Sequence, residues 1–375
     1  MTPRVALFTG NYNYAIDGVA LTMNRLVEYL ERVGVPVRVY APIAAKPVIP
    51  HSGTLVSVPS IPLPPTPYRL GLGVTPSVKH DLHAFAPNIV HIATPDVLGF
   101  AALRWARRRR VPAVTTYHTH FVSYLKYYHL GFLERLTWRA HTWFYPACKQ
   151  VYVAAASMAD ELRANGVHAN YIEAPFGVDP AQFHVGRRSP VWRRSLGIGD
   201  DEVVVGFVGR LVWEKGLAVF ADVLNSLKAS GAKFRALVVG DGPAGPGLKA
   251  RLPDAVYTGY LTNELLATAF ASADIFFYPS ASETFGCVTV EALASGTPAV
   301  VADATGSRDI VRNGTDGLVC PAGDVAAFAA ALRWLIEDPA ERGRLRAAGL
   351  KRAKGYEWDA VHARMVDNYR VVLGG

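Results

Sequence analysis

Short apolar runs alternate with longer amphipathic segments along the whole chain. Near the start, the run RVALFTG predicts a buried strand that ends in a glycine turn. The next segment places Leu21, Leu26 and Leu30 near one face of a helix that ends at Gly34. Further strands are predicted at PVRVYAP, NIVHIAT, AVTTYHT and VYVAAA, with helical segments between them. Such alternation predicts an α/β fold in which a parallel sheet is covered on both faces.

The pattern restarts in the second half of the chain. EVVVGFVGRL and FRALVVGDGP each predict a strand and a turn, and AVYTGYL, DIFFYPS and PAVVADA predict further strands. Between the two halves, residues 173–183 are rich in proline and glycine and predict a hinge. We therefore expect two α/β domains, at residues 1–174 and 175–356. Residues 357–375 predict a helix that either closes the second domain or crosses back to the first.

One long stretch breaks this alternation. It runs from Pro42 to Pro76 and contains nine prolines. A stretch of this length and composition predicts an irregular surface excursion near a site.

Composition narrows the class of protein. The 375 residues are 50% hydrophobic and 19% charged, which excludes a disordered or low-complexity chain. The cysteines Cys148, Cys287 and Cys320 are odd in number and far apart, so they indicate neither a disulfide framework nor a metal site. They favour a reducing, cytoplasmic setting. The N-terminal residues do not predict a signal peptide, and no run approaches the ~18 apolar residues that a membrane span needs.

The net charge of +8 is concentrated in one half of the chain. Residues 1–174 contain 17 Lys/Arg and 9 Asp/Glu, whereas residues 175–375 contain 22 of each. The strongest local element is the run Arg107–Arg110. It predicts either a helix whose last turn is cationic, as the helix dipole favours, or a surface that docks on an anionic membrane or nucleic acid. No recognised nucleic-acid-binding motif accompanies it, so we expect no nucleic-acid partner.

The segment GRLVWEKG, Gly209–Gly216, carries the first candidate chemistry of the second half. It follows a predicted strand and opens a helix, so its backbone amides form an anion site. Arg210 and Lys215 add two cations, which makes a diphosphate the natural occupant. A glycine turn with surface cations explains the spacing equally well.

The segment ETFGCVTVE is more specific. Glu283 follows the predicted strand DIFFYPS and therefore lies at the carboxyl edge of the sheet, where such folds bind ligands. Glu291 falls about two turns into the following helix. The helix start at Thr284–Cys287 would present amide donors to a sugar or phosphate. The alternatives are a helix-start acid for Glu283 and a surface glutamate for Glu291.

The segment GDGPAG matches G-x-G-x-x-G at Gly240, Gly242 and Gly245. A single match is weak support for a dinucleotide cofactor. Because Pro243 and Pro246 disfavour a helix start here, we interpret the segment as another loop at the ligand edge. An NAD-dependent oxidoreductase is kept as a remote alternative.

Taken together, Arg210, Lys215, Glu283 and Glu291 resemble the motifs of the retaining glycosyltransferases of family GT4. The family pattern G-R-L-x-x-x-K-G stands at Gly209–Gly216, and E-x7-E joins the two glutamates. The hinge PFGVD, the loop VGDGP and the strand end PSASE follow in the family's order, so the resemblance covers nearly the whole chain. It implies the GT-B fold, in which two Rossmann-like domains face each other across a cleft.

In the second domain, the resemblance assigns Arg210 and Lys215 to the diphosphate of a nucleotide sugar. Glu283 would contact the sugar hydroxyls, and Glu291 would accept hydrogen bonds from the ribose. The other implied donor-binding positions lie in three loops: Gly209, Gly240, Thr284, Phe285, Gly286 and Cys287. No D-x-D pattern is present, and the two cations make a metal ion unnecessary, so no metal or other cofactor is expected.

In the first domain, Gly18 matches the family's glycine turn after the first strand and would approach the donor phosphate. Asp17 replaces the usual first glycine and is assigned to the acceptor. His118 matches a family histidine that faces the donor sugar, and it is assigned a catalytic role with Arg210, Lys215 and Glu283. Tyr124 and Lys126 belong to an aromatic, cationic stretch that suits a lipid headgroup. The alternative for that stretch is an ordinary amphipathic helix.

The resemblance implies hexose transfer with an α linkage and retained configuration, by front-face substitution. It favours GDP-mannose over a UDP-hexose as the donor. The basic first half favours a glycolipid or phospholipid acceptor and a peripheral position on the inner face of the cell membrane. A soluble sugar or sugar-phosphate acceptor is the alternative.

Overall fold

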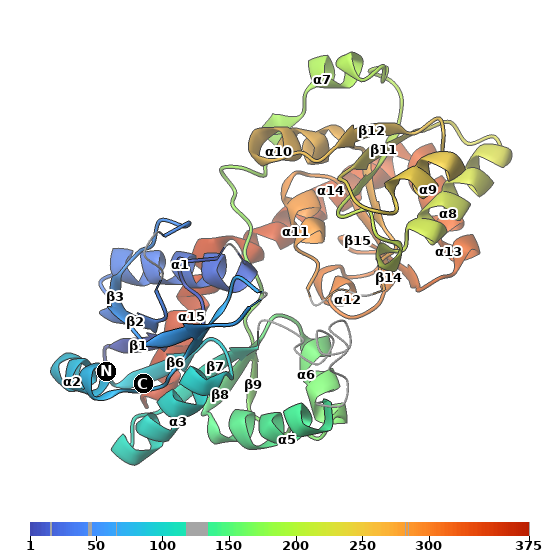
Figure 1. Ribbon diagram of the computed structural model, residues 1–375. Coiled ribbons are helices and arrows are strands. Elements are labelled where there is room, and N and C mark those ends of the chain that lie inside the picture. The colour runs from blue at the N-terminus through green and yellow to red at the C-terminus, as the bar shows by residue number, and fades with distance from the viewer. Residues whose placement is uncertain are drawn as a thin grey trace. The chain divides into compact units, whose positions relative to one another are not determined.

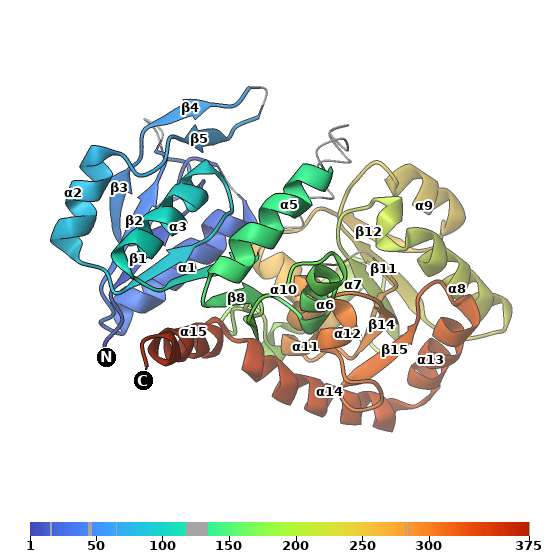
Figure 2. The ribbon, with the colours of Figure 1, turned by 90° about the horizontal axis from the view of Figure 1, so that it is seen from below.

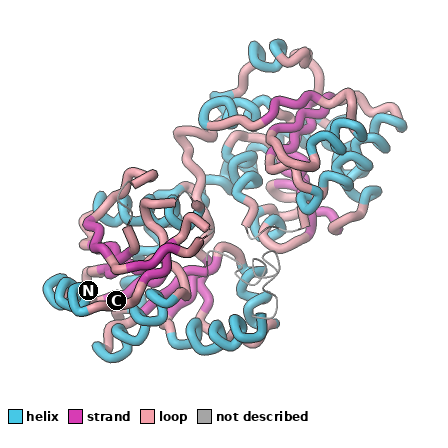
Figure 3. The backbone as a smooth tube through the Cα atoms, in the orientation of Figure 1, coloured by secondary structure: helices cyan, strands magenta, loops and turns pink. Residues whose placement is uncertain are grey.

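A computed structural model describes residues 1–15, 17–43, 47–64, 66–117, 134–281, 283 and 285–374. The chain divides into two compact units, Met1–Pro175 with Val361–Gly375, and Phe176–Ala360. In each unit a parallel sheet lies between helices (Figures 1 and 3). These two Rossmann-like units confirm the predicted α/β class.

The first unit is built on a seven-stranded parallel sheet with the strand order β3-β2-β1-β6-β7-β8-β9. Its inner strands are fully buried, which explains why they appear in the sequence as continuous apolar runs. The strands are β1 (Val5–Phe8), β2 (Val37–Ala41), β3 (Thr54–Ser57), β6 (Ile89–Ile92), β7 (Ala113–Tyr117), β8 (Gln150–Val153) and β9 (Tyr171–Glu173).

Helices cover this sheet, and two of them begin at a capping aspartate. Asp17 accepts a hydrogen bond from the Ala20 N–H, and Asp96 accepts one from the Gly99 N–H, both at 2.8 Å. The arginine run ends a helix, as predicted, with Arg107–Arg109 in its last turn. Among the described residues of this unit, the helices that precede the second unit are α1 (Gly18–Arg32), α2 (Pro76–Phe85), α3 (Val97–Arg109), α5 (Glu134–Phe144) and α6 (Ala156–Ala164), with a 3₁₀ turn at Tyr145–Ala147.

The proline-rich stretch is more regular than the sequence predicted. β3 pairs with β2 and extends the sheet, and β4 (Ser60–Pro62) and β5 (Arg69–Gly71) form an antiparallel hairpin that projects from it (Figure 2). The prediction of an irregular stretch was wrong because these strands have three or four residues and are partly exposed, so no apolar run marks them.

The last helix, α15 (Trp358–Val372), packs on the first sheet although it follows the second unit in the chain (Figures 1 and 2). Met365 and Val366 join the buried core of that unit. Tyr369 is fully buried, and its hydroxyl lies 2.6 Å from Nδ1 of the buried His91. Nε2 of His91 lies 2.7 Å from the Thr116 hydroxyl. The helix is therefore tied to two strands of the first sheet.

The second unit has a six-stranded parallel sheet with the order β12-β11-β10-β13-β14-β15. Its strands are β10 (Val204–Val208), β11 (Arg235–Val239), β12 (Val256–Gly259), β13 (Ile275–Tyr278), β14 (Ala299–Asp303) and β15 (Gly317–Pro321). Its helices are α7 (Pro190–Ser195), α8 (Leu217–Ala229), α9 (Gly245–Arg251), α10 (Asn263–Ser272), α11 (Cys287–Ala294), α12 (Ser307–Ile310), α13 (Val325–Glu337) and α14 (Pro339–Ala353). Three 3₁₀ turns complete it, at Val185–Arg187, Trp213–Lys215 and Lys354–Tyr356.

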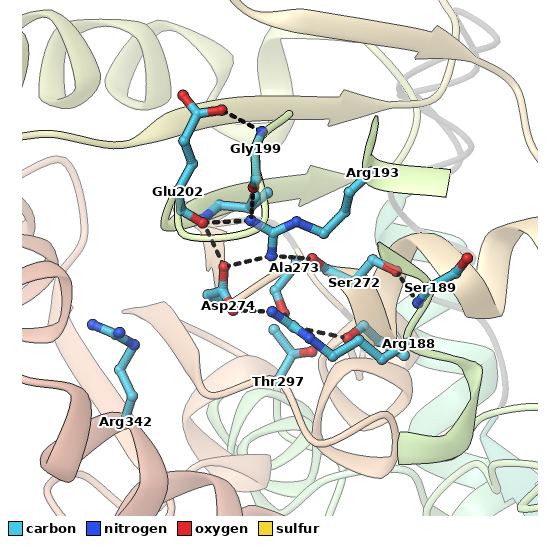
Figure 4. A network of polar contacts seen from close by, with 12 residues as sticks. Arg188, Ser189, Arg193, Gly199, Glu202, Ser272, Ala273, Asp274, Thr297 and Arg342 are labelled. Atoms are coloured by element: carbon cyan, nitrogen blue, oxygen red, sulfur yellow. Dashed lines mark hydrogen bonds and ion pairs between the residues drawn. The ribbon is translucent and has the colours of Figure 1, made fainter. Parts of the chain in front are cut away.

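Two arginines fasten the start of this unit to the base of its sheet (Figure 4). Arg193 of α7 is only 2% exposed, and it donates to Asp274 Oδ2 at 3.1 Å and to three backbone carbonyls. Arg188 donates to Asp274 Oδ1 at 2.7 Å. Asp274 directly precedes β13, so the network fixes the start of the strand that leads to Glu283.

The GDGPAG segment does open a helix. α9 begins at Gly245, with Pro246 in its first turn. The prediction that Pro243 and Pro246 disfavour a helix start was wrong. A proline's missing N–H costs little in the first helical turn, because the N–H groups there have no partner within the helix.

Candidate active site

The loops that follow β10 and β13 meet at the carboxyl edge of the second sheet. The loop after β10 ends in the 3₁₀ turn Trp213–Lys215, and α8 begins after Gly216. Gly216 has φ +73°, and a Cβ at this position would overlap the carbonyl oxygen of Pro279 in the other loop. Glycine permits this close approach, which brings Lys215 beside the loop after β13.

Lys215 and Glu283 form the centre of the candidate site. Lys215 Nζ donates to Glu283 Oε1 at 2.6 Å, and the two side chains are 15% and 12% exposed. The same oxygen accepts hydrogen bonds from the Tyr278 and Ser280 hydroxyls, each at 2.8 Å. Burial, with the nearby charge of Glu283, raises the pKa of Tyr278 well above its ordinary value, so this phenol remains a donor. Three donors thus hold one carboxylate oxygen.

Gly240 and Gly242 allow two neighbouring loops to pack together. A Cβ at Gly240 would overlap the carbonyl of Gly209, and a Cβ at Gly242 would overlap that of Leu211. Gly209 and Leu211 also donate backbone hydrogen bonds to the end of β11 and the loop after it. This packing accounts for the glycine motif without a dinucleotide.

Arg210 lies on the exposed side of the loop after β10. Its side chain is 74% exposed and lies 3.5 Å from the carboxylate of Glu214. The structure therefore brings Lys215 and Glu283 together and leaves Arg210 outside this pair.

α11 begins directly after the loop that carries Glu283. Gly286 has φ +95° and precedes the first helical residue, Cys287. The first N–H groups of an α-helix have no hydrogen-bond partner within the helix. In α11 these groups lie at the end that adjoins the loop carrying Glu283. Phe285 is buried and Cys287 is exposed, while Thr284 lies outside the described residues.

Glu291 lies half-buried in the second turn of α11. Burial raises its pKa to about 7, because the charged carboxylate loses hydration. Carboxyl groups perturbed in this way are concentrated at functional sites.

In the first unit, Asp17 is the N-cap of α1 and Gly18 is the first residue of that helix. The Asp17 carboxylate caps the helix with one oxygen and accepts from the Asn11 side-chain amide, at 2.6 Å, with the other. Gly18 is exposed, and a Cβ there would meet open space. The remaining predicted residues of this unit lie outside the described residues: His118, Tyr124 and Lys126.

Sequence reasoning missed the polar residues that hold this arrangement. Tyr278 and Ser280 precede Glu283 by five and three positions, so their place at the same strand end was a usable signal. Asn11 carried no such signal, because its contact with Asp17 depends on how the turn after β1 closes.

Two family models match the chain. The model described as Glycosyltransferase Family 4 matches residues 16–182, and the model described as Glycosyl transferases group 1 matches residues 189–352. The gap between the two matches falls near the start of the second unit.

The chain is similar to known glycosyltransferases over most of its length. It is 33% identical to the GDP-mannose-dependent alpha-mannosyltransferase of Corynebacterium glutamicum, over 99% of this chain and 89% of that protein. It is 31% identical to sulfoquinovosyl transferase SQD2 of Arabidopsis thaliana, over 96% of this chain and 72% of that protein. It is 24% identical to alpha-monoglucosyldiacylglycerol synthase of Acholeplasma laidlawii, over 84% of each. Among solved structures, sucrose-phosphate synthase from Thermosynechococcus elongatus matches with a TM-score of 0.74 and 22% identity over 99% of both chains.

The two Rossmann-like units and these matches define a GT-B enzyme that transfers a sugar from a nucleotide sugar. The chain belongs to glycosyltransferase family 4. The resemblance inferred from the sequence motifs is thereby confirmed, and the oxidoreductase alternative is set aside.

Proposed function

We propose that this glycosyltransferase moves a hexose from a nucleoside diphosphate sugar to an acceptor hydroxyl with retention of the α configuration. The observation that carries the proposal is the largely buried pair of Lys215 and Glu283 at the ligand-binding edge of the second sheet. GDP-mannose is the proposed donor, supported by the similarity to the GDP-mannose-dependent mannosyltransferase. A UDP-hexose is the second candidate.

Lys215 is assigned to the donor diphosphate. An ammonium group has three N–H donors, so Lys215 can hold Glu283 and a phosphate oxygen together. Arg210 lies on the same loop, and its long, exposed side chain can turn toward the second phosphate. Lys215 and Arg210 together supply the positive charge that a metal ion would otherwise provide, so the proposal includes none.

Glu283 is assigned to the donor sugar. Its Oε1 is occupied by three donors, and Oε2 is the atom that would accept from the sugar hydroxyls. A carboxylate held by a cation and two hydroxyls is a weak nucleophile, which supports front-face substitution. In that reaction the acceptor oxygen bonds to the anomeric carbon as the bond to the phosphate breaks. The acceptor proton passes to the departing phosphate, whose charge Lys215 stabilises.

The start of α11 is assigned to the rest of the donor. The amides of Phe285 to Cys287, with Thr284, would bind sugar or phosphate, and Glu291 would accept from the ribose hydroxyls. In the first unit, Gly18 would approach the phosphate, and Asp17 would shape that turn. His118 is assigned to the donor sugar.

A donor screen tests this function. The purified chain is given GDP-mannose or UDP-glucose with a lipid extract, nucleotide release is measured, and the anomeric configuration of the product is read by NMR. We expect GDP release, an α product, and a loss of about 100-fold or more in Glu283→Gln. A β product would exclude retention, and full activity in Glu283→Gln would exclude the assigned site.

Two helices of the first unit form a cationic, aromatic surface. α3 and α5 lie side by side (Figures 1 and 2), with the Phe100 and Trp143 rings stacked at 5.6 Å and Arg107 5.9 Å from the Trp143 ring centre. Trp143 is 43% exposed and Leu136 is 64% exposed. The two helices and the residue that ends α3 carry exposed arginines: Arg104, Arg107, Arg108, Arg109, Arg110, Arg135 and Arg139. We call this the α3–α5 surface.

We propose that the α3–α5 surface docks on the anionic inner face of the cell membrane and that the acceptor is a lipid. An exposed indole ring beside arginines suits the headgroup region of a bilayer. The similarity to alpha-monoglucosyldiacylglycerol synthase supports the same class of acceptor. No helix within the described part of the chain has the length and apolarity to cross a bilayer.

Flotation with anionic vesicles tests the membrane proposal. We expect binding at low salt, weaker binding at high salt, and loss of binding in Arg107→Glu/Arg108→Glu. Lys233→Glu/Lys351→Glu makes the same charge change at exposed positions of the second unit and should retain binding. A wild-type chain that does not bind at low salt would instead favour a soluble sugar or sugar-phosphate acceptor.

A further inference from the structure

The chain passes between the two units twice, after Pro175 and after Ala360. Just inside the second unit, the passing segments are hydrogen-bonded to each other. The Val178 N–H donates to the Tyr356 carbonyl at 2.7 Å, and the Trp358 N–H donates to the Val178 carbonyl at 3.3 Å. We call these two segments, residues 176–178 and 356–358, the crossing bridge.

The side chain of Phe285 packs on both segments of the crossing bridge. Its ring centre lies 5.7 Å from that of Phe176, with an angle of 60° between the planes, and 5.9 Å from that of Tyr356. Phe285 is 2% exposed and Tyr356 is 8% exposed. Phe285 belongs to the loop between β13 and α11, residues 279–286, which also carries Glu283 and which we call the donor loop. The donor loop and the crossing bridge therefore share one aromatic cluster.

The backbone of Phe285 is confined from another side. Gly306 has φ +83°, and a Cβ there would lie 2.7 Å from the Phe285 carbonyl oxygen. In a close-packed interior, a residue confined on several sides cannot shift its backbone without moving its side chain. A change in the donor loop is therefore passed to the Phe285 ring.

We propose that Phe285 is a positioning residue that couples donor binding to the crossing bridge. This inference rests on the donor site assigned above. That assignment uses the backbone amide of Phe285, whereas the inference concerns its side chain. A nucleotide that orders Glu283 and the start of α11 would order the Phe285 ring and stabilise the two bridge hydrogen bonds. The coupling is reciprocal, so loosening the bridge weakens donor binding by the same free energy. α15 continues from the bridge into the first unit, so the stabilised segment is the one that joins the units.

Hydrogen exchange of the full chain tests the coupling, with GDP or UDP as the probe, whichever nucleotide is released in the donor screen. We expect saturating nucleotide to slow exchange of the Val178 and Trp358 amides by about tenfold. Phe285→Leu should lose this slowing and raise the donor KM about tenfold, with a smaller change in kcat. Phe176→Leu leaves the sequence of the donor loop unaltered and should also lose the slowing and raise the KM. Agreement between the two variants would show that the losses do not come from a folding defect caused by Phe285→Leu.

Phe183→Leu is the matched control. Phe183 makes a similar T-shaped contact, with Phe270 at 5.8 Å, in the same unit, and its variant should keep the slowing and the KM. The inference is overturned if bound nucleotide protects the start of α11 but not Val178 and Trp358, or if Phe285→Leu keeps the wild-type KM and slowing. If neither nucleotide binds, the donor-site assignment itself fails and the inference falls with it.

Discussion

The ammonium of Lys215 lies 2.6 Å from Oε1 of Glu283, although the two residues are 68 positions apart. Both side chains are largely withdrawn from water, so their charges are screened less than those of a surface pair. The pair forms where the loops after β10 and β13 meet, and Gly216 is the residue that allows this meeting. The position of one cation and one carboxylate at the sheet edge is the basis of the first prediction.

Lys215→Ala should lower kcat/KM by about 10²–10³, because it removes a preorganised charge at the leaving group. Nucleotide release measures this loss. Lys228→Ala is the matched control, since Lys228 pairs at 3.3 Å with Asp254, which is 77% exposed. Such a surface pair contributes about 0–1 kcal/mol, so the control should keep its activity and fold. Normal turnover in Lys215→Ala would exclude its assigned role.

Gly216→Ala should lower the free energy of unfolding by about 2–4 kcal/mol, because the new methyl group overlaps the Pro279 carbonyl. It should also lose activity, because the overlap displaces Lys215. Gly231→Ala is the control that separates the cost of a positive φ from the cost of an overlapping methyl group. Gly231 has φ +81° with nothing near its Cβ position, so its variant should lose only about 1 kcal/mol and stay active. Urea unfolding compares the two, and equal losses would contradict the proposed close contact.

Gly18→Ala should lower donor kcat/KM about tenfold or more while leaving stability unchanged or slightly higher. The added methyl group meets open space in the protein, so only a bound donor would be obstructed. Gly343→Ala in α14 also places a methyl group in open space on a helix. Gly343→Ala should likewise leave the free energy of unfolding unchanged or raise it by up to ~1 kcal/mol, and it should keep full activity. Equal activity in both variants would remove Gly18 from the donor site.

Glu291 should make donor binding depend on pH. Its pKa of about 7 leaves the carboxyl group protonated in acid, where it accepts ribose hydrogen bonds less well. The donor KM should therefore fall as pH rises through 7 and then level off, and Glu291→Gln should flatten this profile. Stability changes in the opposite sense. The folded state holds this proton more tightly than the unfolded chain, so the contribution is complete below about pH 4 and is lost as pH rises through 7. An unchanged KM profile in Glu291→Gln would contradict the assignment.

Arg193→Met should cost about 3–5 kcal/mol of unfolding free energy, because three backbone carbonyls lose the Arg193 donor and Asp274 loses one of its two arginines, keeping only Arg188. The neighbouring Arg194 is 55% exposed and pairs with Asp200, which is 52% exposed. Arg194→Met should therefore cost at most ~1 kcal/mol. Denaturant unfolding of both variants checks the difference, and similar costs would show that the network in Figure 4 is not a stabilising anchor.

Sequence reasoning predicted the long buried strands but not the short ones. β1 and β10 are buried on both faces, so their positions are apolar without interruption and are visible in the sequence. β3 and the β4–β5 hairpin are short and partly exposed, and pairing with a neighbour, which no local pattern encodes, makes them strands. The prediction about Pro246 was wrong for a different reason: proline breaks the interior of a helix but is favoured in its first turn, where Pro246 lies.

The sequence by itself determined the α/β class and the placement of Lys215 and Glu283 in loops that follow strands, because these follow from local apolar periodicity and from spacing along the chain. It also indicated the family, through the resemblance of its motifs to those of family GT4. Only the tertiary structure decided that one carboxylate oxygen of Glu283 receives Lys215, Tyr278 and Ser280 together. It also decided that Arg210 lies to the exposed side and that Phe285 packs on the crossing bridge. These relationships depend on how separate loops close on one another, and that closure is set by glycine contacts and packing between segments far apart in the chain.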